Sequence, residues 1–165
     1  MYVHDRMDLV ANHTSDEHAW FQESQSSKTN PKRDWYIWRP PSSQSPSPSS
    51  PSLRPPNNWS SFFQGSTWEY SPATNEYYLH LFARGQPDLN WENADVRAAV
   101  WRTMRFWLER GCDGFRLDVV NMISKVPGLP DAPVAEPGKE WQVATGLFVN
   151  GYVIFIIVVV CFKGN

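Results

Sequence analysis

The sequence has few cysteines and no excess of charge of either sign. Only Cys112 and Cys161 occur among 165 residues, so no disulfide framework or metal-ligand spacing can be built, and a reducing compartment is expected. The 15 basic and 17 acidic residues give a formal net charge of −2, without the basic footprint of nucleic-acid-binding proteins. We therefore expect no nucleic-acid partner, no metal and no cofactor.

Long apolar runs are also scarce. The first residues, MYVHDRMDLVANH, have neither the basic nor the apolar region of a signal peptide, so a cytoplasmic location is expected. The uninterrupted apolar run is Tyr152–Phe162, which is shorter than the roughly 20 residues that a membrane-spanning helix needs. We expect no membrane partner, and anchoring through this tail stays the alternative.

Apolar spacing predicts two strands and one helix. Residues 7–11 (MDLVA) and 114–120 (GFRLDVV) are short apolar runs bounded by polar segments, as buried strands are. Residues 93–110 carry a helical pattern, capped by Asn93 or Asn90 and ended by Gly111. The spacing predicts that one helix face carries Val96, Val100, Trp107 and Leu108.

The residues between the first strand and the helix are polar and aromatic, with little periodicity. In residues 40–56, fourteen of seventeen are Pro or Ser, which predicts an extended, solvated loop. Three histidines, His4, His18 and His80, lack metal-ligand spacing, and we interpret them as structural or exposed.

Two charged residues interrupt the second strand. Side chains alternate along a strand, so Arg116 and Asp118 point the same way, and Phe115 and Leu117 point the other way. A surface ion pair is common and contributes little. A charged pair facing a closed interior is costly unless it performs chemistry.

The order of elements favours the second interpretation. A strand, crossover and strand imply two adjacent parallel strands of an α/β protein, and in α/β barrels the carboxyl ends of such strands build the active site. Asp8, Asn12 and His13 lie at the end of the first strand, and Arg116 and Asp118 lie near the end of the second. We expect both groups to meet on one rim.

Five collinear blocks carry a family resemblance. DLVANHTSDEHAWF, QPDLNWENADVR and GCDGFRLDVVNMISKVPGLPDAP closely resemble the α-glucosidase and oligo-1,6-glucosidase branch of glycoside hydrolase family 13, in the α-amylase superfamily. PPNNWSSFFQGSTWEY and EYYLHLFARGQPDLNW resemble the inserted second domain of that branch. The resemblance runs from about residue 7 to residue 151.

The resemblance implies an α/β fold, a partial (β/α)8 TIM barrel with an inserted irregular α+β domain. The tail that follows does not resemble the family, and we interpret it as the translation of a retained intron. The implied division is barrel strand 3 in 1–11, the inserted domain in 12–88 with its Pro/Ser-rich loop at 39–58, barrel helix 3 and strand 4 in 89–126, a barrel loop in 127–151 and the apolar tail in 152–165.

The resemblance also implies residue roles. Asp118 matches the catalytic nucleophile and Arg116 the arginine beside it, which favours the ionised carboxylate. Asp8 and His13 match the motif whose histidine contacts the sugar. Asn12 is implied to position the loop, and the motif QPDLN contains Gln86 and Asp88. Trp20, Trp35, Trp38, Trp59 and Trp68 could stack on sugar rings, but packing is the expected role of most of them.

Hydrolysis with retention needs an ionised nucleophile and a protonated carboxylic acid. The family's general-acid motif is absent from this sequence, so we expect the isolated chain to be inactive. The expected substrates are oligosaccharides of the isomaltose, maltose or sucrose type. In the family an apolar residue after the nucleophile, here Val119, accompanies α-1,6 preference, which implies an isomaltose-type enzyme.

Two other hypotheses stay open. The chain could be a non-catalytic amylase-like subunit, or a sugar-binding remnant with a membrane segment at its C-terminus. Asn12-His13-Thr14 and Asn58-Trp59-Ser60 are formal N-glycosylation sequons, but the lack of a signal peptide gives them no expected use.

Overall fold

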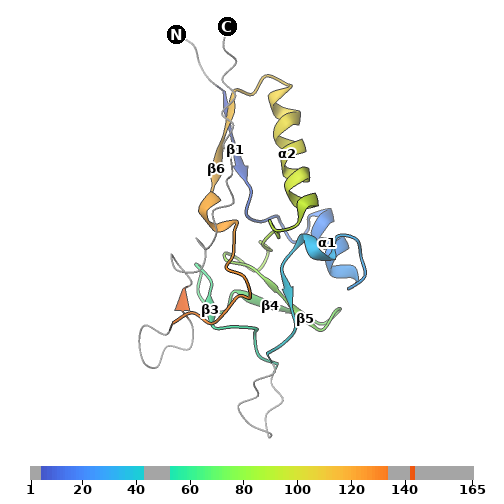
Figure 1. Cartoon of the computed structure of the whole chain (residues 1–165), viewed down its shortest axis with the longest axis vertical. Helices are drawn as coiled ribbons and strands as arrows, with labels where there is room; N and C mark the ends of the chain where they lie inside the picture. Colours follow the sequence, from blue (N-terminus) through green and yellow to red (C-terminus); the bar gives the residue numbers. More distant parts are fainter. Residues whose placement is uncertain (1–4, 43–52, 134–141, 144–165) are drawn as a thin grey trace, which may run out of the picture.

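A two-stranded parallel sheet and a three-stranded antiparallel sheet organise the structure. The computed structural model describes residues 5–42, 53–133 and 142–143. Strands β1 (Arg6–Val10) and β6 (Gly114–Asp118) run beside helix α2 (Ala94–Leu108) at one end of the molecule. The antiparallel strands lie at the other end (Figure 1).

The parallel pair confirms the predicted order of strand, helix and strand. Asp8 lies opposite Arg116, and Val10 lies opposite Asp118. Leu9 and Leu117, on alternate positions of the two strands, pack against the core beneath, as the period of two requires.

Strand β6 ends earlier than predicted, at Asp118. The next residue, Val119, has φ 43 and ψ 36, a left-handed conformation that β-branched side chains rarely adopt. This conformation stops the strand and turns the chain into the short 3-10 helix η2 (Val120–Met122).

Helix α2 begins and ends where the sequence predicts. The Asn93 side chain accepts a hydrogen bond from the backbone N–H of Asp95 at 2.8 Å, and Gly111 has φ +100 just beyond the last turn. Val96 and Val100 are buried, but Trp107 is 39% exposed. The predicted apolar face is therefore wrong at Trp107, because α2 meets the described core through Val96, Ala99, Val100 and Met104, and Trp107 is not among the residues packed against it.

The segment between the parallel strands has helix and sheet of its own. Strands β2 (Trp38–Arg39), β5 (Glu76–Leu79) and β4 (Trp68–Ser71) pair in that order, all antiparallel. Helix α1 (Ala19–Ser26) and the 3-10 helix η1 (Arg33–Trp35) precede them. Strand β3 (Trp59–Ser60) pairs in parallel with β7 (Gln142–Val143). Of the predicted Pro/Ser loop, residues 43–52 lie outside the described residues.

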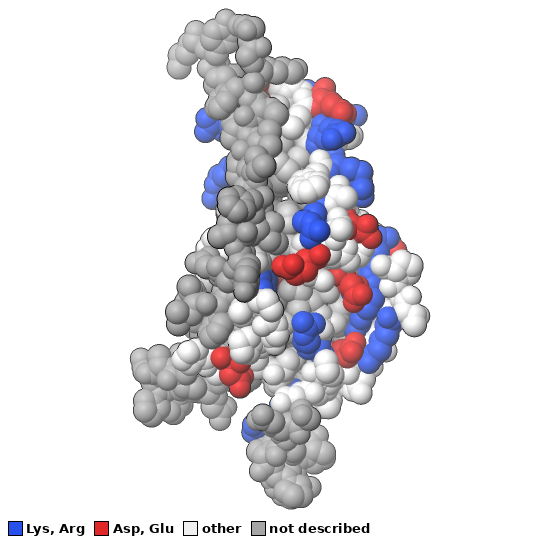
Figure 2. Space-filling view, in the orientation of Figure 1, with Lys and Arg blue, Asp and Glu red and all other residues white. Residues whose placement is uncertain are grey.

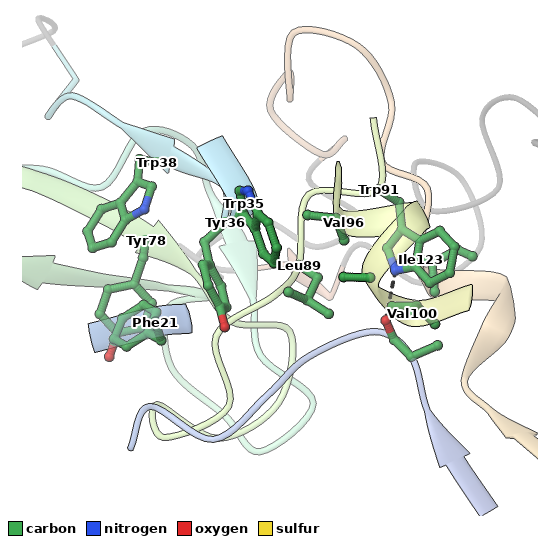
Figure 3. Packing of buried hydrophobic residues seen from close by; sticks show 12 residues of the cluster. Phe21, Trp35, Tyr36, Trp38, Tyr78, Leu89, Trp91, Val96, Val100 and Ile123 are labelled. Atoms are coloured by element: carbon green, nitrogen blue, oxygen red, sulfur yellow. Dashed lines mark hydrogen bonds between the residues drawn. The ribbon is translucent and has the colours of Figure 1, made fainter. Parts of the chain in front are cut away.

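Aromatic side chains fill the core between α1, the antiparallel sheet and α2. Phe21 contacts both Tyr36 and Tyr78 edge to face, and the Trp91 indole N–H donates to the carbonyl of Ala11 at 2.7 Å (Figure 3). The packing interpretation is confirmed for four of the five tryptophans, which are buried: Trp35, Trp38, Trp59 and Trp68.

The chain after β6 packs onto the antiparallel part. Asn58 and Ala132 exchange two hydrogen bonds, of 2.9 and 2.7 Å, between the side-chain amide and the peptide group. The Asn57 side chain donates to the carbonyl of Leu129 at 3.0 Å, and the Trp59 indole donates to that of Pro130 at 2.8 Å. Segments more than 70 residues apart are thus joined by well-formed hydrogen bonds.

On the surface, charges of both signs are intermixed over the face drawn in Figure 2. Within the described part of the chain, no helix is long and apolar enough to span a membrane. The same residues hold no cluster of three His, Cys, Asp or Glu side chains suited to a metal ion. The apolar tail lies outside the described residues.

Candidate functional site

Three charged side chains form a row across the two parallel strands. The Arg116 guanidinium lies between two carboxylates, 3.2 Å from Asp8 Oδ2 and 3.3 Å from Asp118 Oδ1. The register sets Asp8 beside Arg116, and the strand period sets Asp118 on the same face. We call Asp8, Arg116 and Asp118 the carboxylate row.

The row is more exposed than the sequence suggests. The side chains of Asp8 and Arg116 are 65% and 63% exposed, and that of Asp118 is 38% exposed. The prediction of an interior Arg116–Asp118 pair is therefore wrong for this chain. On the opposite face, Leu9 and Leu117 pack against the core that includes Val96 and Val100 of α2, whereas the row is left exposed among the described residues. Asp8 also lies in the middle of β1, not at its end.

A second cluster lies just past the end of β1 and contains the chain's most deeply buried ion pair among the described residues. Lys125 Nζ is 2.7 Å from Asp88 Oδ2, with the two side chains 5% and 0% exposed. Lys125 also donates to Asn12 Oδ1 at 2.8 Å and to the carbonyl of Met122 at 2.7 Å. The other carboxylate oxygen of Asp88 accepts from the backbone N–H of Leu81 at 3.1 Å.

His13 completes this second cluster. Its Nε2 lies 3.0 Å from Gln86 Nε2, and its Nδ1 lies 3.4 Å from Asn12 Nδ2. A β-bridge joins His13 to Asp88. We call the five residues of this group the histidine cluster: Asn12, His13, Gln86, Asp88 and Lys125.

The structure therefore brings together four of the five predicted residues of the two sequence motifs, leaves Asp8 in the carboxylate row, and adds Lys125, which the sequence did not reveal. Lys125 stands in an irregular segment without periodicity, where a lysine is normally solvated. The sequence holds one indication that Lys125 belongs to the site: the lysine lies in the segment SKVPG, within a block that resembles the family. Burial lowers the pKa of Lys125, and the neighbouring Asp88 carboxylate opposes that shift.

The two groups meet at His13. Burial lowers the pKa of its imidazole, which favours the neutral ring; the Asp88 and Asp118 carboxylates oppose this shift, and Lys125 adds to it. Asp118 of the carboxylate row is therefore one of the charges that act on His13.

One aromatic ring contacts His13, and two further rings pack on that one. Phe82 lies with its ring centroid 5.3 Å from that of His13 and stacks on Phe62 at 5.2 Å. Phe63, 66% exposed, contacts Phe82 at 6.0 Å. The sequence did not predict a phenylalanine beside His13, because phenylalanines in such a segment usually pack in a core.

Two other predicted histidines have structural roles. The buried His80 has its Nδ1 2.9 Å from the carbonyl of Phe82, and the His18 side chain caps α1 by accepting from the N–H of Trp20 at 3.1 Å. His4 lies outside the described residues.

A pocket of about 130 Å³ between η1–β2 and residues 123–129 shares only Lys125 with the site.

Comparison with known proteins identifies the family of this chain. The α-amylase catalytic domain matches residues 3–151 of the chain. The chain belongs to the α-amylase catalytic-domain family. It is 57% identical to the α-glucosidase of Schizosaccharomyces pombe and 56% identical to the oligo-1,6-glucosidase of Parageobacillus thermoglucosidasius, each over 145 residues and 88% of the chain.

Solved structures agree with this membership in the α-amylase family. Trehalose-6-phosphate hydrolase from Bacillus licheniformis aligns with 90% of the chain at a TM-score of 0.75 and 45% identity. An isomaltulose synthase variant from Erwinia rhapontici, solved with sucrose, aligns with 79% at a TM-score of 0.72 and 46% identity. The chain spans about a quarter of these relatives, 24% of each glucosidase and of the hydrolase, and 22% of the synthase.

The buried ion pair of Lys125 with Asp88 should contribute strongly to the stability of this α-amylase-family chain. Lys125→Met leaves the buried Asp88 carboxylate without its partner, so we expect the free energy of unfolding to fall by about 3–5 kcal/mol, measured by urea denaturation. Lys32→Met is the control, because its partially exposed pair with Glu23 should contribute no more than about 1 kcal/mol. Equal losses in both variants would contradict a special role for the buried pair.

The burial of His80 should make the stability of the chain depend on pH. Burial lowers the pKa of His80 below its ordinary 6.5, against smaller upward effects from the Phe82 carbonyl and Asp88. Between the lowered pKa and 6.5 the unfolded chain binds more protons, so the free energy of unfolding should fall as the pH drops below 6.5. His80→Gln should reduce this slope by up to about 1.4 kcal/mol per pH unit. An unchanged slope in urea titrations between pH 4.5 and 7.5 would refute it.

Proposed function

We propose that this chain is the nucleophile-bearing part of a retaining α-glucosidase that releases terminal α-linked glucose from short oligosaccharides. The observation that carries the proposal is the carboxylate row, with one arginine set between two carboxylates on adjacent parallel strands. The high identity to an α-glucosidase and an oligo-1,6-glucosidase supports it.

Asp118 is the proposed nucleophile. A retaining glycosidase uses an ionised carboxylate to attack the anomeric carbon and form a glycosyl-enzyme, which water then hydrolyses. The Arg116 guanidinium donates to the Asp118 carboxylate at 3.3 Å and so orients that carboxylate. Because Asp8 shares that guanidinium, Arg116 is also held in place from the β1 side.

His13 and Asp8 are the proposed contacts for the glucosyl unit. His13 stands at the meeting point of both residue groups, and the Phe82 ring beside it offers an apolar surface for the C–H face of a sugar. A hydrogen bond from His13 to a sugar hydroxyl assists catalysis if it strengthens in the transition state.

Asn12, Gln86 and Asp88 support the rim without reacting. Asp88 is fully buried and bonded on both carboxylate oxygens. In the complete protein we place β1 and β6 as the third and fourth strands of a (β/α)8 barrel, and residues 12–88 as its inserted domain. The chain's alignment with a quarter of larger solved relatives supports this placement.

No described residue is assigned as the general acid, and Glu136 and Glu140 lie outside the described residues. We propose that the acid belongs to the remainder of the complete protein. Without it, protonation of the leaving group is lost, a factor of about 10²–10⁴. The isolated chain is then inactive.

The activity can be tested by a graft. The matching 145 residues of this chain replace their counterpart in the S. pombe α-glucosidase, and release of glucose from maltose and isomaltose is followed. We expect an active graft, and Asp118→Asn should lower kcat on the order of 10⁴-fold or more. Asp34→Asn, an exposed carboxylate on η1, is the control. A fully active Asp118→Asn graft would exclude the assigned nucleophile.

Linkage preference gives a separate test. Val119 follows Asp118 in a left-handed turn, and its side chain is proposed to favour isomaltose-type α-1,6 linkages. Val119→Thr keeps the branched shape and adds a hydroxyl, so the ratio of kcat/KM for isomaltose to that for maltose should fall about tenfold or more. Val119→Ile, which stays apolar, should retain the ratio. A graft that cleaves maltose but not isomaltose from the start would end the α-1,6 hypothesis.

A further inference from the structure

His13 is contacted by two side-chain amides, one at each ring nitrogen. The orientation of the first amide is fixed by the backbone. Gln86 Oε1 accepts from the N–H of Ala83 at 3.0 Å, and since that group can only donate, the oxygen end must face it. The NH2 end of Gln86 therefore faces His13 Nε2, at 3.0 Å.

The orientation of the second amide is fixed by the buried ammonium. Lys125 Nζ can only donate, and it lies 2.8 Å from Asn12 Oδ1. The NH2 end of Asn12 therefore faces His13 Nδ1, at 3.4 Å. Both ring nitrogens of His13 thus face donors.

A neutral imidazole carries one N–H and one lone pair, so it can accept from only one of these two amides. The contact to Gln86 has the length of a hydrogen bond, whereas that to Asn12 is at the long end of the range. The difference indicates that Nε2 accepts from Gln86, and that the proton sits on Nδ1, facing the Asn12 NH2 group.

We propose that Gln86 is a positioning residue that holds His13 in its Nδ1–H tautomer, with Asn12 as the competing donor for the other nitrogen. The competition is built into the histidine cluster, because Lys125 keeps the Asn12 amide from turning its oxygen toward the ring. The charged groups that face His13 are Asp88, Lys125 and Asp118.

The consequence for sugar binding rests on the proposed function. For His13 to donate from Nε2 to a sugar hydroxyl, the Gln86 NH2 group must leave that nitrogen. The Nδ1 proton passes to water, Nε2 takes a proton from water, and the net charge is unchanged. Nδ1 then accepts from Asn12, which is already oriented. Gln86 thereby opposes the sugar-binding tautomer, and Asn12 supports it.

The tautomer can be measured directly. In the full 165-residue chain, ¹⁵N shifts and long-range ¹H–¹⁵N correlations of His13 at pH 7.5 show which nitrogen is protonated. We expect the proton on Nδ1. Gln86→Leu removes the donor at Nε2, so the proton should move to Nε2. Gln86→Glu places an acceptor there, which should protonate Nε2 and raise the measured pKa of His13 by about 1 unit or more.

Gln22→Leu is the control, because the exposed Gln22 side chain donates to the carbonyl of Asp16 at 2.6 Å and belongs to α1, not to the histidine cluster. It should leave the His13 spectrum unchanged. A wild-type proton on Nε2, or a Gln86→Leu variant that keeps its proton on Nδ1, would overturn the proposal. Gln86 is only partly buried, and amide dispersion checks the fold of each variant.

The graft gives a second readout. In an active graft, Gln86→Leu should lower KM for maltose, because His13 Nε2 is then free to donate to the sugar hydroxyl, while Gln22→Leu should leave KM unchanged; a raised KM in Gln86→Leu counts against the proposal. An inactive wild-type graft would refute the proposed function alone, since the spectra of His13 need no activity. The two failures are therefore distinguishable.

Discussion

The ion pair between Lys125 and Asp88 is the contact on which the rest of the site depends. Both charges are withdrawn from water, which is tolerable only because each finds further partners, Asn12 and Met122 for the ammonium and the Leu81 N–H for the carboxylate. The pair and its hydrogen bonds join the segment after β6 to residue 88, in the segment between the parallel strands, and to Asn12 just past the end of β1. Three stretches that are distant in sequence thus acquire one fixed geometry around His13.

The carboxylate row is organised differently. Its geometry comes from strand register and alternation, so it needs no burial to be aligned. The turn at Val119 links the two arrangements, because it ends the strand that carries Asp118 and directs the chain toward Lys125. The position of the proposed nucleophile is therefore tied to the histidine cluster by a short stretch of chain, the six residues between Asp118 and Lys125.

Local patterns predicted the strand, helix and strand well, since Asn93 was one of two expected caps, Gly111 lies just beyond the last turn, and the strands are short apolar runs with polar neighbours. Period alone could not predict which faces are covered, so Trp107 and the Arg116–Asp118 pair are more exposed than expected. The order of the strands singled out the residues at their ends, and the family resemblance gave those residues roles and added Gln86 and Asp88. Lys125 was not predicted as a site residue, because the burial of a single lysine depends on contacts with distant residues, which no local pattern encodes.

The two sequons acquire a practical meaning from the hydrogen bonds around them. The Asn12 amide is fully buried, and the Asn58 amide is bonded in both directions to Ala132. An oligosaccharide attached to either nitrogen would occupy space that the folded protein fills with its own peptide groups. In an expression host that passes the polypeptide through a glycosylating compartment, an oligosaccharide attached before folding would prevent the native packing. Bacterial expression avoids this modification.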